Sequence, residues 1–183
     1  MGKPARQVEV IAIDGPAGAG KSTVARLVAR QLGWTYIDTG AMYRALCLKA
    51  LRAGVDLEDD QALTALARET VITLESDGEQ LRVFLDGAEV TSVIRSPEVN
   101  ARVSTVAANP GVRRELARLQ RELALRGRAV LDGRDVGTIV VPEARVKVYL
   151  TADFDERVRR RYQDLQRQGF ALSEDEVAAA LAA

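Results

Sequence analysis

Hydrophobic and polar positions in the first third of the chain follow two alternating spacings, one typical of strands and one typical of helices. A run rich in β-branched residues at 8–13 has the length of a buried parallel strand. After Lys21 the apolar residues recur every three or four positions, which is the helical period, and Gly33 follows as a helix stop. The order repeats with a short strand at 34–37 and a helix to about Arg52. This βαβα order predicts an α/β fold.

The spacing changes in the middle of the chain. After a short helix that ends near Arg68, three brief apolar runs are separated by Asp-Gly pairs, which are turn signals. We interpret 69–95 as a small antiparallel β module inserted into an α/β core formed by 1–68 and 96–183. The strands are expected at 71–74, 81–85 and 89–91, with turns at 76–78 and 86–87.

The remainder of the chain returns to long helices and buried strands. Two prolines stand where helices begin, because proline suits the first helical position. Two further apolar runs have the composition of strands that are covered on both faces. We expect helices from Pro97 and Pro110, strands at 129–131 and 146–150, a basic helix between Asp153 and Gly169, and an alanine-rich helix opening at 173–176.

Composition narrows the classes of protein that the chain could represent. With 183 residues, 47% hydrophobic and 28% charged, it has the size of one compact domain and enough apolar mass to exclude intrinsic disorder. Its 26 basic and 26 acidic residues balance, so no overall charge favours nucleic acid or a membrane surface as partner. It has one cysteine, Cys47, and no histidine, which excludes an intramolecular disulfide and the common zinc, haem and Ser-His chemistries. We expect a cytoplasmic protein, because no secretory signal or long apolar run is present. We also expect a monomer, although no sequence pattern addresses the oligomeric state.

The segment that follows the first strand carries a phosphate-binding pattern. It matches G-x-x-x-x-G-K-[ST] and lies between a strand and a helix, as this motif requires. Glycines allow a tight turn whose N–H groups point at phosphate oxygens, next to the positive end of the helix dipole. Lys21 can bridge β- and γ-phosphates and Ser22 can bind Mg²⁺. The alternative is a glycine-rich connection without chemical meaning. The expected ATP-binding residues are Gly15, Pro16, Ala17, Gly18, Ala19, Gly20, Lys21, Ser22 and Thr23.

A second polar segment, 38–44, follows the second strand, at the edge where open α/β sheets bind ligands. Arg44 offers a planar set of donors for a second phosphate, and Thr39 and Tyr43 are candidates to line an acceptor pocket. The alternative is an ordinary helix start, with Thr39 as the cap and Arg44 on a solvated face.

A third polar segment, 132–138, follows the strand at 129–131 and belongs to the same edge. Arg134 is placed to reach a substrate phosphate, and Asp132 could hold water on Mg²⁺ or orient neighbouring arginines. The alternative is a turn in which an aspartate caps the backbone and pairs with an arginine.

Four segments together resemble the bacterial cytidylate kinases: GPAGAGKST, DTGAMYRA, NARVSTVAANPGVR and LDGRDVGT. The resemblance runs in order from Val10 to about Gly169 and includes the β module, which that family carries in its monophosphate-binding region. It implies a P-loop kinase with a parallel core sheet flanked by helices. It also implies transfer of the γ-phosphoryl group of ATP to CMP or dCMP with Mg²⁺, by a site in which Lys21, Asp132 and Arg134 act in catalysis.

The positions that match the family's motifs imply which residues of this chain form the acceptor site. They assign the acceptor phosphate to Arg44 and Arg134 and the cytosine to Ser104, Arg113 and Asp135. A carboxylate at 135 favours the N4 amino donor of cytosine over the O4 acceptor of uracil. Without the resemblance, Arg113 would be a surface residue and Ser104 a small residue on a helix face. Thr39 and Tyr43 fall near the same pocket, and the family has serine or threonine at the position of Thr39.

The basic helix resembles the family's mobile lid, which we place at about 155–172. Arg157 and Arg161 are i and i+4 and therefore share a face, so we expect them to reach the ATP phosphates. The alternative is a solvated basic face.

The chain ends at Ala183, before the sugar-contacting segment, final core strand and helix of the family. We expect the fold to lack this strand and helix, through truncation or in a naturally short form. Other small-molecule P-loop kinases, or a non-catalytic ATP-dependent binding module, remain as alternative functions.

Overall fold

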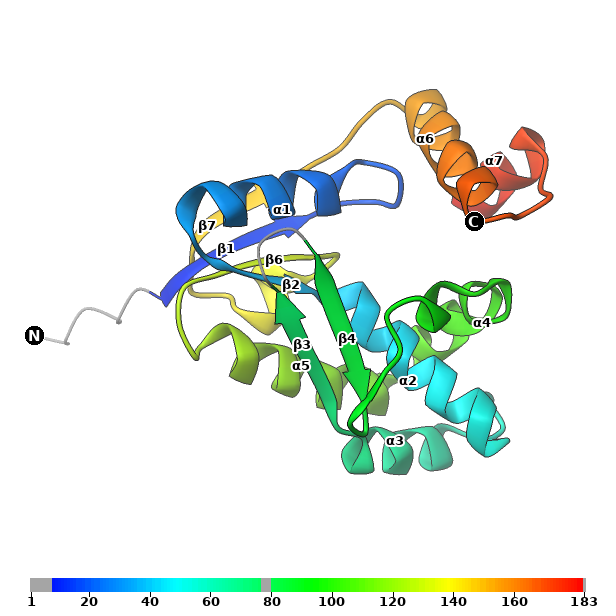
Figure 1. Cartoon of the computed structure of the whole chain (residues 1–183), viewed down its shortest axis with the longest axis horizontal. Helices are drawn as coiled ribbons and strands as arrows, with labels where there is room; N and C mark the ends of the chain where they lie inside the picture. The colour runs from blue at the N-terminus through cyan, green and yellow to red at the C-terminus, as the bar shows by residue number, and fades with distance from the viewer. Residues whose placement is uncertain (1–7, 77–79, 183) are drawn as a thin grey trace, which may run out of the picture.

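A four-stranded parallel sheet forms the centre of the molecule (Figure 1). The computed structural model describes residues 8–76 and 80–182. The strands lie in the order β2-β6-β1-β7, and all three neighbouring pairs are parallel. Their bounds are β1 (Val8–Asp14), β2 (Thr35–Asp38), β6 (Ala129–Gly133) and β7 (Ala144–Tyr149). The predicted α/β class is confirmed.

Helices cover the two faces of this sheet. On one face α1 (Lys21–Leu32) packs Ala25 and Ala29 against Ile13 and Val130. On the other face α5 (Pro110–Ala124) and the short π-helix η2 (Val136–Val140) cover the alternate residues of the strands. Successive side chains of β1, β2 and β6 point to opposite faces of the sheet and therefore fill two separate cores, as expected for parallel strands buried on both faces.

The prediction that the last strand is buried on both faces is wrong. In β7 only Ala144 is buried, whereas Val146 and Val148 are 42% and 39% exposed and Tyr149 is 71% exposed. Among the described residues β7 lies at the edge of the sheet and pairs with β1 alone. Its apolar composition alone could not distinguish an edge strand from a central one.

A second core lies beside the sheet and contains the predicted antiparallel module. Leu46, Val83, Ile94 and Leu116, from four different elements, all contribute to it and are almost completely buried. The module therefore packs with helices of the α/β part. The elements are α2 (Thr39–Ala53), α3 (Asp60–Glu69), β3 (Ile72–Ser76), β4 (Leu81–Leu85), β5 (Ala88–Glu89), the 3₁₀ helix η1 (Val93–Arg95) and α4 (Pro97–Ala108), together with α5.

Local signals explain most of these boundaries. Asp86 and Gly87 both have positive φ angles, 49° and 85°, so the predicted turn at 86–87 is confirmed. Of the turn predicted at 76–78, positions 77 and 78 lie outside the described residues, and Ser76 is the last residue of β3. Ser96 caps α4 and Asn109 caps α5, each followed by the proline at the first helical position.

The C-terminal pair of helices forms a separate small layer. Helices α6 (Phe154–Arg167) and α7 (Glu174–Ala182) share a core of Val158, Leu165 and Val177. Figure 1 shows the pair set apart from the sheet, joined to β7 by a single connection and standing over the loop that precedes α1. Within 8–76 and 80–182, none of the helices is long and apolar enough to cross a membrane.

Candidate functional site

Three strands of the parallel sheet carry an aspartate at the same edge. Asp14 ends β1, Asp38 ends β2, and Asp132 is the next to last residue of β6. Asp38 and Asp132 are direct neighbours in the strand register, and all three side chains are buried. Asp14 is satisfied by the backbone, because the N–H groups of Val136 and Gly137 each donate to its carboxylate at 2.8 Å. Buried carboxylates thus line the edge at which this fold class binds ligands.

The loop between β1 and α1 depends on glycine. Gly18 and Gly20 have φ angles of 78° and 92°, which favour glycine, and Gly20 is the residue that precedes α1. A side chain at Gly15 would meet the carbonyl oxygen of Leu150 at 2.0 Å, and one at Gly18 would meet the backbone of Arg157 at 2.6 Å. The loop is therefore closely packed against the start of the connection to α6 and against α6 itself.

Lys21 and Ser22 both lie at the start of α1, as the motif predicts. The Lys21 ammonium donates to the carbonyl oxygen of Pro16 at 2.8 Å, so it is folded over the loop. Burial lowers the pKa of Lys21, and the nearby charge of Arg134 acts in the same direction, whereas Asp132 opposes it. Arg134 itself is exposed and makes no hydrogen bond or ion pair with the part of the chain described here.

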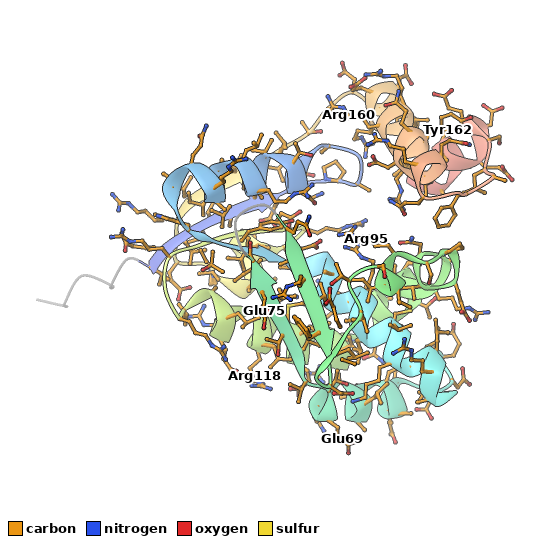
Figure 2. The ribbon with its side chains drawn as sticks, viewed as in Figure 1. Glu69, Glu75, Arg95, Arg118, Arg160 and Tyr162 are labelled. Carbon is orange, nitrogen blue, oxygen red and sulfur yellow. The ribbon has the colours of Figure 1, made fainter. Side chains whose placement is uncertain are left out.

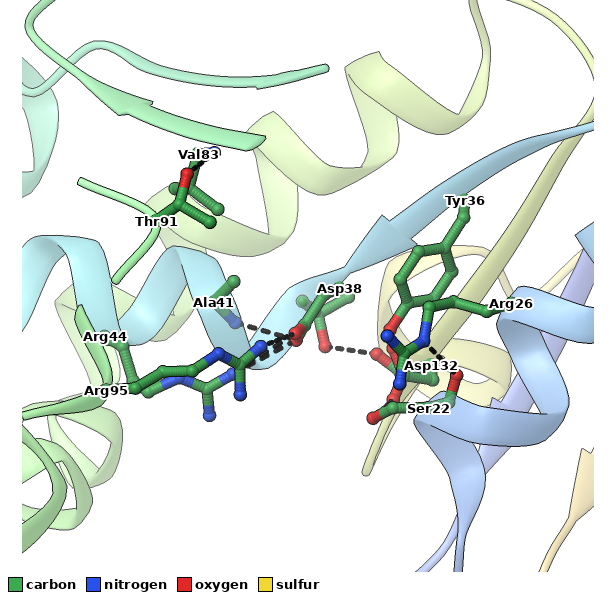
Figure 3. A network of polar contacts seen from close by, with 11 residues as sticks. Ser22, Arg26, Tyr36, Asp38, Ala41, Arg44, Val83, Thr91, Arg95 and Asp132 are labelled. Atoms are coloured by element: carbon green, nitrogen blue, oxygen red, sulfur yellow. Dashed lines mark hydrogen bonds and ion pairs between the residues drawn. The ribbon is translucent and has the colours of Figure 1, made fainter. Parts of the chain in front are cut away.

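Asp132 is the centre of a buried polar network (Figure 3). The Ser22 hydroxyl donates to its Oδ2 at 2.6 Å and the Tyr36 hydroxyl donates to its Oδ1 at 2.9 Å. Burial raises the pKa of Asp132 to about 6, and the neighbouring charge of Asp38 adds to this effect. The alternative in which 132–138 is a turn capped by an aspartate is therefore wrong for Asp132, whose carboxylate accepts from two side-chain hydroxyls. Tyr36 was not predicted, because a tyrosine in a strand ordinarily indicates core packing.

The Thr39 side chain forms a hydrogen bond with the backbone of a neighbouring strand. This side chain is buried and its hydroxyl donates to the carbonyl oxygen of Asp132 at 2.7 Å, which ties the start of α2 to β6. The helix cap is Asp38, whose Oδ1 accepts from the N–H of Ala41 at 2.8 Å. The alternative in which Thr39 caps this helix is therefore wrong.

Two arginines converge on Asp38. Arg44, on α2, and Arg95, on η1, approach its Oδ2 with N···O distances of 3.2 and 3.3 Å. The side chain of Arg44 is only 20% exposed, so its alternative placement on a solvated face is wrong. Arg95 was not predicted, because 51 positions separate it from Arg44 and no motif joins them.

A groove of about 540 Å³ lies between α2, α4, α5 and η2. Arg113 and Asp135, which sequence analysis assigned to one base, meet there in an ion pair of 2.5 Å. Tyr43 lines the same groove, and burial raises its pKa, with a smaller contribution from the charge of Asp135. Ser104 is exposed on α4, one turn before Ala108, and is not part of the lining. The remaining lining residues are Ala108, Pro110, Arg114, Ala117, Ile139 and Val140.

The basic face of α6 meets the phosphate loop through Arg160. Its Nη1 donates to the carbonyl oxygen of Ala19 at 3.2 Å. The guanidinium of Arg157, one of the predicted pair, lies over the ring of Phe154, 5.3 Å from its centroid. Sequence analysis did not predict this contact of Arg160, because it selected Arg157 and Arg161, which share a neighbouring face of the helix.

Arg161, the other predicted member of that pair, lies nearer the acceptor side. It is half-buried, and burial lowers its pKa. The like charges of Arg44 and Arg95 lower it further, while Asp164 opposes them. The structure therefore brings Arg160 to the loop and Arg161 towards the arginines on Asp38.

Comparison with known proteins gives a consistent result. A family model described as cytidylate kinase matches residues 11–183. The chain is 55% identical over 168 residues to a cytidylate kinase of Pelotomaculum thermopropionicum, covering 91% of this chain and 74% of that protein. It is 56% identical over 167 residues to one of Desulfitobacterium hafniense, covering 91% and 72%.

A bifunctional pantoate ligase/cytidylate kinase of Synechococcus sp. strain JA-3-3Ab is 55% identical over 173 residues, which make up 93% of this chain and 32% of that protein. Among solved structures, TT1252 from Thermus thermophilus matches with a TM-score of 0.43 and 26% identity, covering 93% and 76% of the two chains.

Proposed function

The chain belongs to the cytidylate kinase family of ATP-dependent phosphotransferases, and we propose that it transfers the γ-phosphoryl group of ATP to CMP or dCMP, giving ADP and CDP or dCDP. One observation carries the proposal. The phosphate loop leads into α1 on one face of the parallel sheet, and the groove with the Arg113–Asp135 pair is lined by α5 and η2, which cover the other face. Asp132, at the strand edge, accepts from Ser22 of α1, and Asp135 of the groove follows it three residues later. A donor phosphate and an acceptor nucleotide can therefore face each other there.

On the donor side we assign the ATP phosphates to the loop Gly15, Pro16, Ala17, Gly18, Ala19 and Gly20 and to Lys21, Ser22 and Thr23. The glycine-rich backbone of the loop and the first turn of α1 provide N–H donors for anions, and the positive end of the α1 dipole lies at the same place. Lys21 would exchange its bond to Pro16 for the β- and γ-phosphates. Arg157 and Arg161 remain predicted phosphate ligands, and Arg160 joins them because it already contacts the loop.

Mg²⁺ is the cation that we propose for this site. The described residues contain no cluster of three or more acidic, histidine or cysteine side chains of the kind that holds a metal alone. The Ser22 hydroxyl and the buried Asp132 carboxylate, 2.6 Å apart, instead provide the oxygen donors that Mg²⁺ takes alongside nucleotide phosphates. When bound, the cation would neutralise phosphate charge.

On the acceptor side we assign the CMP phosphate to Arg44 and Arg134. The base would lie in the groove, where Asp135 accepts from the cytosine amino group, Arg113 donates to the ring, and Tyr43 forms a wall. Ser104 and Thr39 remain predictions from the family resemblance, since neither lines the groove.

The chemistry requires positioning and charge neutralisation. An oxygen of the CMP phosphate attacks the γ-phosphorus in line, and the bond from the γ-phosphorus to the β,γ-bridging oxygen breaks. Lys21 and the arginines stabilise charge on the equatorial oxygens, so no protein nucleophile is required. We propose that 155–172 acts as a lid that closes on the substrates and excludes water.

The test is ADP release by a coupled assay with CMP, dCMP, UMP, AMP and shikimate as acceptors. We expect turnover with CMP, dCMP or both to exceed that with the other acceptors. ATP binding without acceptor-dependent ADP release would identify a binding module, and a preference for AMP or shikimate would identify a different kinase. We further propose that the protein works as a cytoplasmic monomer, which a measurement of its mass in solution tests.

A further inference from the structure

Asp38 occupies the boundary between the two halves of the site. Figure 3 shows Arg44 and Arg95 on one side of its carboxylate and the network of Asp132, Ser22 and Tyr36 on the other. The Asp38 side chain is only 7% exposed, and the N–H of Ala41 fixes one of its oxygens. Asp38 therefore cannot move away without releasing the first turn of α2.

The charges at Asp38 do not balance. Two guanidinium groups share one carboxylate, which leaves one positive charge unmatched, and the buried Nε of Arg44 has no hydrogen-bond partner in the described part of the chain. A buried N–H without a partner is costly unless a ligand completes it. The arrangement is that of an anion site whose arginines are already assembled.

Separate elements bring the two arginines to this carboxylate. Arg44 rises from the second turn of α2, and Gly40 leaves room for its guanidinium, because a Cβ there would lie 3.3 Å from Nη1. Arg95 ends η1, which the fully buried Ile94 anchors in the second core, and its carbonyl oxygen accepts from Asn100. Figure 2 shows Arg95 extending from the body towards α6.

We propose that Asp38 is a positioning residue of the acceptor site: it holds Arg44 and Arg95 side by side so that both bind the phosphate of the acceptor nucleotide. This inference rests on the proposed function and adds Arg95 to the acceptor-binding residues. The carboxylate orients the two guanidinium groups and reduces the repulsion between them, while their remaining N–H donors face the phosphate. Burial lowers the pKa of Arg161, and the charges of Arg44 and Arg95 lower it further, which fits a third cation close to the same cluster.

Asp38→Asn tests the inference, because asparagine caps a helix as well as aspartate does but carries no charge. Losing the charge removes two charge-assisted contacts, so we expect the KM for CMP to rise about tenfold or more while the KM for ATP stays within twofold. Asp59→Asn is the matched control. Asp59 caps α3 by accepting from the N–H groups of Gln61 and Ala62 and contacts no arginine among the described residues, so both KM values should stay unchanged.

Arg95 supplies the second measurement. Arg95→Ala should raise the KM for CMP, and the double variant with Asp38→Asn should be less impaired than the product of the two single effects, because both changes act on one contact. An unchanged or lower KM for CMP in Asp38→Asn would overturn the inference, as would fully multiplicative effects or an equal rise in both KM values.

Wild-type protein is assayed alongside. If it does not phosphorylate CMP, the proposed function fails, whereas an active wild type with an unaffected Asp38→Asn variant refutes the positioning role alone.

Discussion

Lys21 illustrates how a single side chain is held ready for a ligand. Its ammonium is half-buried against the carbonyl oxygen of Pro16, and burial lowers its pKa, so the charge is only partly satisfied before ATP arrives. We expect Lys21→Ala to lower kcat at least about 100-fold, by analogy with the loss of one donor to transition-state charge. The fold should persist, because Lys21 contributes no hydrophobic contact to the cores. Turnover measured beside circular dichroism checks both statements, and a folded variant of normal activity would refute the role of the loop.

Asp135 should decide between pyrimidine bases. In the proposed site its carboxylate would accept from the cytosine amino group and repel the O4 of uracil, whereas an amide can donate to that oxygen. We expect Asp135→Asn to lower the CMP:UMP ratio of kcat/KM by roughly 5- to 150-fold, the value of one good base contact. The substitution also weakens the ion pair with Arg113, so kcat/KM for CMP itself should fall. A ratio that stays constant while both rates fall would mean that Asp135 supports the groove without selecting the base.

The site residues that sequence analysis could propose are those that a short motif fixes. Lys21 and Ser22 follow from the loop pattern, and Arg113 and Asp135 from the family resemblance. Arg95 and Asp38 escape prediction because their contact joins η1 to β2 across 57 positions and is created by tertiary packing. Arg160 escapes because three successive arginines present three directions around a helix, and only the docked position of α6 selects one of them.

The buried carboxylate near the end of β6 lowers the stability of the folded protein at neutral pH. Asp132 lies at the end of β6 with a folded-state pKa of about 6, above the ordinary aspartate value, and its hydrogen-bond donors are the neutral hydroxyls of Ser22 and Tyr36. Because the folded state holds the proton more tightly, this carboxyl favours folding most below about pH 4, and that contribution is lost as pH rises through 6.

Asp132→Asn should therefore stabilise the nucleotide-free protein at pH 7, by on the order of 2 kcal/mol, while lowering activity. The gain should vanish near pH 4, where the wild-type carboxyl is already neutral. Urea unfolding of both proteins between pH 4 and pH 8 measures the difference. A difference that does not change with pH would show that the charge of Asp132 is not its cause.

Helices, strands and turns could be predicted from the sequence where short-range signals determine them, but not where contacts between distant segments do. Capping residues, prolines and the Asp86-Gly87 turn act within a few residues, so the helices and the second hairpin could be predicted. The exposure of β7 depends on which strand becomes the edge of the sheet. The π-helix η2 depends on Asp14, which lies 122 positions from Val136 and accepts from its N–H, so no local pattern could reveal it.

At the scale of the whole molecule, α6 and α7 form a unit that touches the phosphate loop through few polar contacts. Their own core is small, and the unit reaches the loop through the Arg160 side chain and the backbone of Arg157. Such a unit can move as a body without disturbing the sheet, which is the property required of a lid. Arg160 thereby couples the position of the unit to the conformation of the loop.

We therefore expect Arg160→Ala to raise the KM for ATP about two- to tenfold, the value of one modest hydrogen bond, while the KM for CMP changes little. Arg167→Ala is the matched control on the same helix, because Arg167 is 74% exposed, pairs only with Asp164 among the described residues, and should leave both constants unchanged. Hydrogen exchange gives an independent measurement. ATP should protect the backbone amides of α6 in wild type and in Arg167→Ala, but less in Arg160→Ala. Equal protection in all three proteins, with equal KM values, would mean that the α6–α7 unit docks without Arg160 and that the backbone contact at Gly18 is sufficient.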